Sequence, residues 1–202
     1  SDNESFLEDV LESVEKDAAV RSGGLRFTLR DKIQNHRLTV QQAVVGGCVG
    51  GTYENLWALK EILGDYIIPA DGVPLGVYPA SQAVLSEAEQ QGVLGALIRT
   101  GITIHPCICG PCFGSTDIPS NNTISVRHVS RNYYSREGSR PDQGQLSASA
   151  LMDARSIAAT VRRGGRLTAA EEVLTAGMEN STGNVDYGFD DSYYHTAVYN
   201  GF

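Results

Sequence analysis

The chain has 202 residues, a formal net charge of −8 at pH 7 and a hydrophobic fraction of 41%. This length suits one domain or two small ones, and the apolar fraction is enough for a sizeable core. The acidic balance argues against nucleic acid as a partner, because nucleic-acid binding needs a basic face. No apolar run approaches the roughly 20 residues of a membrane span, and no signal peptide is visible.

The first half of the chain predicts helices and strands in alternation. An acidic segment with one apolar stripe predicts a surface helix over residues 1–20. The expected order then continues as strand 39–45, a glycine-rich loop, helix 52–63, strand 74–78, helix 81–91, helical turns over 92–100, and strand 101–105. Alternation of this kind predicts an α/β fold, a three-layer domain in which helices flank a mainly parallel sheet.

The second half is less regular. A fourth strand is predicted over 123–126, followed by an irregular basic segment over 127–145. The alanine-rich residues 147–161 predict a helix, with Ser147 as its N-cap. The tail 178–202 lacks periodic apolar positions, so we expect an irregular extension or a linker there. We expect one domain over residues 1–202, with its motifs concentrated at about 42–161.

The cysteines lie in two glycine-containing loops, each after a predicted strand. Cys48 is in the first loop, and Cys107, Cys109 and Cys112 share six residues of the second. Glycine lets backbone come close to a bulky group. Ligand sites of parallel sheets lie outside the carboxyl ends of the strands, so we expect both loops at one edge. Four cysteines are few for a disulfide scaffold, which favours a reducing compartment, the cytoplasm.

Four interpretations of these cysteines compete. Thiolates are the usual ligands of iron–sulfur clusters, and Cys48, Cys109 and Cys112 would supply three. Zinc held by all four cysteines is less favoured because structural zinc sites pair two C-x-x-C-type elements and Cys48 stands alone. The sequence of 109–112 matches the C-G-P-C redox motif, but that motif opens a long helix and here residues 113–119 predict a loop. Inert buried cysteines are the fourth interpretation.

The surrounding residues resemble those of the aconitase family. The similarity extends over about 42–161, and its motifs occur in the family's order. The stretches that carry it are Gly47-Cys48 with Thr52–Leu56, Pro79–Ser81, Cys109–Gly114, Asn122–Ile124 and Ser130–Arg136.

This resemblance implies a [4Fe–4S] cluster with three protein ligands, Cys48, Cys109 and Cys112. The fourth iron would be open to substrate and act as a Lewis acid. Arg131 and Arg136 match family arginines that bind substrate carboxylates, for which the guanidinium fork is suited; structural ion pairs are the alternative role. Ser130 stands at a family asparagine near the cluster, and we group it with the substrate-binding residues.

Two further side chains lie close to these motifs. Cys107 has no ligand counterpart in the family pattern. His105 lies at the end of a predicted strand, before the cysteines. It is a candidate to orient a cluster ligand through a hydrogen bond without binding the metal itself.

The function implied is that of the iron–sulfur domain of an aconitase-like hydro-lyase, a dehydratase or isomerase acting on a hydroxy-polycarboxylic acid. The resemblance covers only the domain with the cluster ligands. The expected partners are therefore the substrate and the remaining domains of a parent enzyme, including a swivel domain. No catalytic residue is matched here, so we expect this chain alone to be inactive and its cluster to be lost in air. The alternative is a non-catalytic cluster-binding or regulatory protein on the same scaffold.

Overall fold

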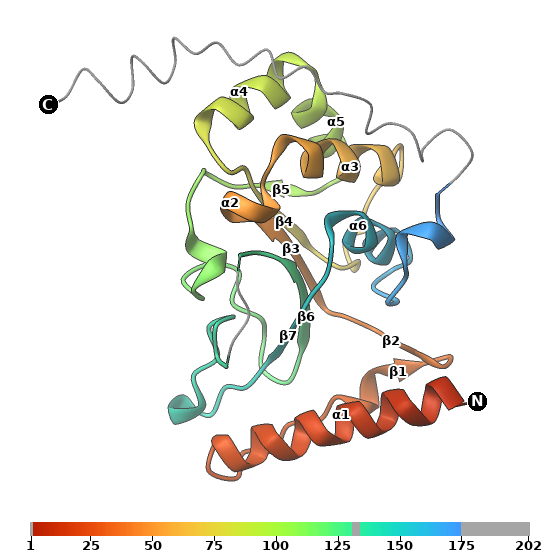
Figure 1. The fold of residues 1–202 in the computed structure, drawn as a ribbon, viewed down its shortest axis with the longest axis vertical. Coiled ribbons are helices and arrows are strands. Elements are labelled where there is room, and N and C mark those ends of the chain that lie inside the picture. The colour runs from red at the N-terminus through yellow and green to blue at the C-terminus, as the bar shows by residue number, and fades with distance from the viewer. Residues whose placement is uncertain (1, 131–133, 175–202) are drawn as a thin grey trace, which may run out of the picture.

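A five-stranded sheet forms the centre of the computed structural model, which describes residues 2–130 and 134–174 (Figure 1). The strand order is β5-β4-β3-β6-β7, and each neighbouring pair is parallel. These strands are β3 (Gln42–Gly46), β4 (Leu75–Tyr78), β5 (Thr103–Ile104), β6 (Ile124–His128) and β7 (Ala148–Leu151). A separate antiparallel pair consists of β1 (Ile33–Gln34) and β2 (Arg37–Leu38).

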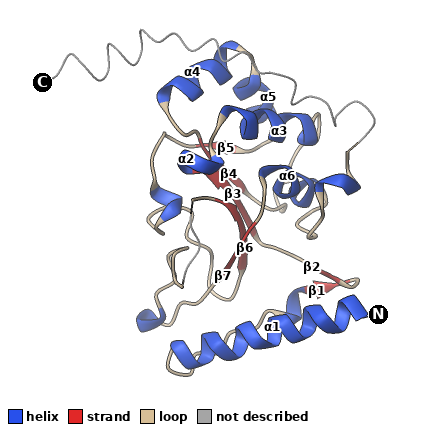
Figure 2. Cartoon of the chain, in the orientation of Figure 1, coloured by secondary structure: helices blue, strands red, loops and turns tan. Residues whose placement is uncertain are grey.

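Helices connect the strands and flank the sheet (Figure 2). The α-helices are α1 (Asp2–Arg21), α2 (Gly47–Gly50), α3 (Tyr53–Leu63), α4 (Gln82–Gln90), α5 (Val93–Arg99) and α6 (Ala154–Arg162). The 3-10 helices are η1 (Arg30–Lys32), η2 (Gly110–Cys112), η3 (Pro141–Gln143) and η4 (Ala170–Glu172). α3 packs against α6, and α4 and α5 pack against α3. The predicted α/β class with a parallel sheet is confirmed.

The two faces of the sheet have different surroundings because successive side chains of a strand point to opposite sides. One set of side chains belongs to the main apolar core, together with residues of α3 and α6: Ala43, Val45, Leu75, Val77, Ile124 and Val126. The alternate positions face the segment that carries the later cysteines, as contacts of Gly76 and Arg127 with Asp117 demonstrate. The first face builds the core, and the second supports the cysteine loop.

The helix predicted over 147–161 is wrong in its first part. Residues 148–151 form β7, which pairs in parallel with β6, and α6 begins only at Ala154. Asp153 is the N-cap, and its side chain accepts a hydrogen bond of 3.0 Å from the Ser156 amide. The helix propensity of alanine is worth only a few tenths of a kcal/mol per residue, so pairing along the edge of a sheet outweighs it. The predicted extension over 178–202 lies outside the described residues.

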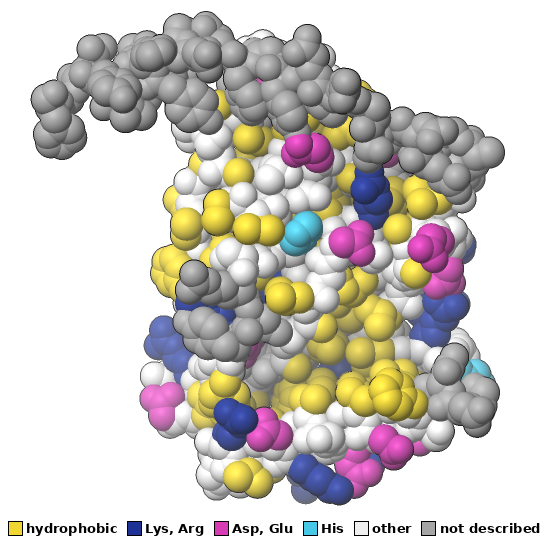
Figure 3. All heavy atoms as spheres, viewed as in Figure 1, with side chains coloured by type: hydrophobic (Ala, Val, Ile, Leu, Met, Phe, Trp, Pro, Cys, Tyr) yellow, Lys and Arg dark blue, Asp and Glu magenta, His cyan; other side chains and the backbone are white. Residues whose placement is uncertain are grey.

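α1 confirms the predicted amphipathic surface helix. Leu11 and Ala18 are buried on its inner side, while Lys16 and Arg21 pair with acidic residues one turn earlier. α1 lies along the lower edge of the molecule in Figure 1. Figure 3, in the same view, shows acidic and basic side chains interspersed along that edge, with hydrophobic side chains above them. None of the described helices has the length and hydropathy that a membrane crossing requires.

Candidate functional site

Cys48 lies on α2, directly after β3 at the carboxyl edge of the sheet. Its neighbouring glycines touch the ends of the adjacent strands. A Cβ atom on Gly50 would lie 1.8 Å from the His128 carbonyl oxygen, and one on Gly51 would lie 2.0 Å from the Tyr78 carbonyl oxygen. The loop therefore fits between β4 and β6 only because these positions carry no side chain.

The second cysteine loop lies against the first. Cys112 ends η2 and Cys109 is its N-cap residue, and η2 contacts α2 (Figure 1). A Cβ atom on Gly47 would lie 2.6 Å from the Cys112 Sγ atom, and Gly47 has a φ of +71°. The Cys112 sulfur thus lies over the backbone next to Cys48.

The thiols differ in exposure. Cys112 is only 4% exposed, whereas Cys48 and Cys109 are exposed and all four cysteines are free. Burial raises the pKa of the Cys107 thiol, which disfavours its thiolate form. Within the part of the chain that the structure describes, no three His, Cys, Asp or Glu side chains are grouped as a metal site.

The three-residue η2 also bears on the redox interpretation. A thioredoxin-type pair opens a long helix, but here the residues after Cys112 leave the helix at Phe113. The C-G-P-C sequence is therefore found in a short turn whose geometry is unlike that of the redox motif.

The predicted substrate-binding residues follow β6. Ser130 is exposed two residues after the strand ends, Arg136 is half-buried, and Arg131 lies outside the described residues. The segment with Arg136 packs on the cysteine loop: a Cβ atom on Gly114 would lie 2.5 Å from the Gly138 Cα atom. The structure thus brings Arg136 and Gly138 against the second cysteine loop.

Behind the cysteine loop lies a group of polar side chains. The His105 ring stacks on the Tyr78 ring at a centroid distance of 4.2 Å, and its Nε2 atom lies 3.6 Å from the Asp117 carboxylate. Burial, the largest influence, raises the pKa of Tyr78 to about 12. His105 thus lies between the Tyr78 ring and the Asp117 carboxylate, next to the segment that follows the later cysteines.

Sequence reasoning missed Tyr78, Asp117 and Arg127 in this group. The strand predicted over 123–126 extends to His128 in the structure, which places Arg127 inside β6 rather than in the irregular segment expected from 127 onward. A charged residue inside a buried strand needs hydrogen-bond partners on the covering segment.

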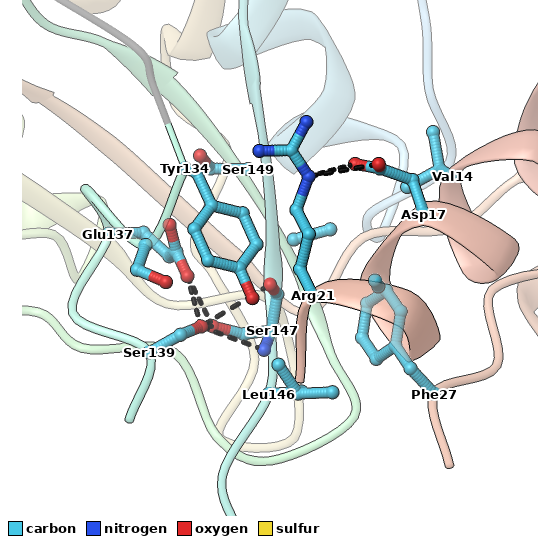
Figure 4. Close-up of a pocket in the computed structure, with 13 residues that line it drawn as sticks. Val14, Asp17, Arg21, Phe27, Tyr134, Glu137, Ser139, Leu146, Ser147 and Ser149 are labelled. Carbon is cyan, nitrogen blue, oxygen red and sulfur yellow. Dashed lines mark hydrogen bonds and ion pairs between the residues drawn. The ribbon is translucent and has the colours of Figure 1, made fainter. Parts of the chain in front are cut away.

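A pocket of about 320 Å³ lies elsewhere, between α1 and the start of β7 (Figure 4). The Glu137 carboxylate accepts hydrogen bonds from the Ser139 and Ser147 hydroxyls, and the Arg21 guanidinium lies 5.1 Å from the centre of the Tyr134 ring. The described lining residues include no predicted site residue. Because the pocket is at the amino end of its strand, we do not assign the functional site to it.

Comparison with known sequences gives one family. The family described as "Aconitase family (aconitate hydratase)" matches residues 3–159. A homoaconitase large subunit from Thermus thermophilus is 37% identical over 136 residues, covering 66% of this chain and 31% of the relative. A 3-isopropylmalate dehydratase large subunit from Methanopyrus kandleri is 35% identical over 102 residues, with coverages of 50% and 25%.

A third relative is the 3-isopropylmalate dehydratase large subunit of Nitratidesulfovibrio vulgaris, 28% identical over 131 residues, which cover 64% of this chain and 31% of the relative. The matched regions therefore span less than a third of the length of these relatives. The family match also begins closer to the N-terminus than the motifs found from the sequence.

Proposed function

Because the chain belongs to the aconitase family, we propose that it is the iron–sulfur part of a hydro-lyase acting on a hydroxy-polycarboxylic acid. The relatives named as dehydratase and homoaconitase large subunits support this reaction class. Since the matches cover less than a third of those relatives, the activity belongs to a larger protein. The partners we propose are the remaining domains of that enzyme, including a swivel domain.

The cofactor that we propose is a [4Fe–4S] cluster held by Cys48, Cys109 and Cys112. Thiolates are the ligands that such clusters use, and the approach of the Cys112 sulfur to Gly47 is the observation that carries the assignment. The three cysteines have the chemistry that such a cluster needs. When the cluster binds, the exposed Cys48 and Cys109 thiols have to move toward Cys112. When bound, the cluster supplies an iron open to substrate, which acts as a Lewis acid.

The protein groups then have separate roles. The glycine contacts of α2 hold the Cys48 backbone at the carboxyl edge. Arg131 and Arg136, with Ser130, bind the substrate carboxylates, because a guanidinium donates two parallel hydrogen bonds to a carboxylate. The packing of Gly138 on Gly114 supports this role, since it keeps the arginine segment beside the cysteine loop.

A general acid or base has to be within reach of the proton that it moves. No residue of this chain matches one in the family pattern, so we propose that the other domains supply it. The free thiols fit a reducing compartment, and we propose the cytoplasm.

Anaerobic reconstitution with iron and sulfide tests the cofactor. We expect bound iron and sulfide together with the broad visible absorption of thiolate-ligated iron, none of which should survive exposure to air. Protein that takes up zinc alone, with no iron under these conditions, would refute the proposal. The parallel assay for zinc also decides against the four-cysteine zinc interpretation if zinc fails to bind.

A further inference from the structure

Arg127 lies on β6, on the sheet face opposite the main core, and is only 2% exposed. Burial lowers its pKa, and nearby acidic groups, first among them Glu137, oppose that shift. A buried cation is costly unless its donors are paired. The Arg127 guanidinium therefore needs hydrogen-bond acceptors around it to offset the cost of its burial.

Its hydrogen bonds join two parts of the molecule. On the sheet, the Nε atom donates to the Ser125 hydroxyl and an Nη2 hydrogen goes to the Gln42 side-chain oxygen, both at 3.1 Å. On the cysteine loop, the Nη1 atom donates to the Pro111 carbonyl at 3.1 Å, and Nη2 also donates to the Asp117 carbonyl. Pro111 directly precedes Cys112, so one of these bonds holds the backbone beside a predicted ligand.

We propose that Arg127 is the positioning residue that holds the second cysteine loop onto the sheet and so sets Cys112 against Gly47. A guanidinium has five N–H donors in a rigid fork, which lets one side chain bind acceptors on the sheet and on the loop. A lysine ammonium at this position donates from a single atom. The importance of the loop for a cluster rests on the proposed function, but the holding of the loop is a property of the protein without a cluster.

The test measures thiol alkylation in the folded protein without cluster, resolved by residue with mass spectrometry. Exposed Cys109 is the internal reference for buried Cys112. In Arg127→Met we expect the Cys112 rate relative to Cys109 to rise at least about tenfold, because loss of a single charge-assisted hydrogen bond is enough for this change. Arg127→Lys keeps the charge and should give an intermediate rise.

The matched control is Arg162→Met. The Arg162 Nη1 atom also donates to backbone carbonyls, those of Ile62 and Leu63 at 2.6 and 3.2 Å, but at the end of α3. This variant should lower the free energy of unfolding without a selective rise at Cys112. An equal rise in both variants would show that Cys112 reacts through general destabilisation, and would overturn the proposal.

A second variant covers the case in which Arg127→Met does not fold. Gln42→Met removes one acceptor on the sheet and leaves Arg127 in place, and it should give a smaller, still selective rise. An unchanged Cys112 ratio in whichever of these variants folds would refute the role of Arg127.

Iron content after anaerobic reconstitution separates this proposal from the proposed function. Wild-type protein that binds no iron but shows the selective Cys112 effect contradicts the cluster assignment and supports the role of Arg127. Iron loss in Arg127→Met with an unchanged Cys112 rate contradicts the role of Arg127 and leaves the cluster assignment standing.

Discussion

Replacement of Gly47 by alanine tests the approach of the two cysteine loops. The added Cβ atom would lie 2.6 Å from the Cys112 sulfur, and the backbone of Gly47 has a φ of +71°. The substitution therefore has two separate costs, one from the backbone conformation and one from the contact. Either the Cys112 loop or α2 has to move.

Gly92→Ala is a control that has the backbone cost but not the steric contact. Gly92 has a φ of +70°, and a Cβ atom there would meet nothing within 4 Å. A left-handed conformation costs an L-residue about 1–2 kcal/mol, which both variants share. Overpacking adds about 1–3 kcal/mol at Gly47 alone. With a urea dependence of about 2 kcal/mol per molar, this difference moves the unfolding midpoint by roughly 1 M.

The assay is equilibrium urea unfolding of Gly47→Ala, Gly92→Ala and wild type without cluster, followed by iron loading. We expect the lowest midpoint and reduced iron content in Gly47→Ala, and near-normal iron content in Gly92→Ala. If the two variants have equal midpoints and equal iron content, Cys112 does not lie against Gly47 and the argument for a joint site fails.

Three further predictions concern the cysteines, a buried carboxylate and catalysis. Cys107→Ser should keep its iron after reconstitution while Cys109→Ser loses it; equal losses would mean that the ligands are wrongly assigned. Burial raises the pKa of Glu15, but hydrogen bonds from the Arg30 and Leu29 amides and from the Arg30 side chain lower it overall. The stabilisation by Glu15 is therefore present above its unfolded pKa of about 4.3 and lost as the pH falls through the lower folded value. Glu15→Gln should cost about 1–3 kcal/mol at pH 7 in urea unfolding and much less near pH 2, and an equal cost at both would contradict this. The reconstituted chain alone should not dehydrate or hydrate a hydroxy-polycarboxylic acid, and turnover by it would refute the need for further domains.

The sequence alone was enough to predict the helices and strands in which apolar residues recur with a clear period. The helix over 52–63 and the strand over 74–78 appear as α3 and β4 within one residue at each end. The edge strand β7 (Ala148–Leu151) was missed because its first three residues are small and the alanine-rich stretch that contains it favours a helix. Its conformation follows from pairing with β6, a long-range contact that local propensity does not report.

The same distinction applies to the site. Motif spacing and the family resemblance predict that Cys48, Cys109 and Cys112 form one site, which stays a prediction. The order of strands predicted the edge at which the two cysteine loops meet, and the structure places both loops there. The supporting residues were not predictable because they act through backbone groups: Arg127 binds two carbonyls of the cysteine loop. Carbonyls occur at every residue, so a sequence pattern cannot identify which of them a buried donor will bind.

From the two faces of the sheet we expect that the core does not need a cluster to fold. The apolar face contacts the helices through side chains such as Val45 and Leu75, which are buried on the side of the sheet opposite the second cysteine loop. The other face contacts that loop through polar groups, including Arg127. Because hydrophobic burial supplies most of the stabilisation of a domain, loss of a cluster should loosen the second face and leave the first intact. A domain organised in this way should stay folded without a cluster. A zinc finger differs, because the binding free energy of its metal supplies its folding free energy.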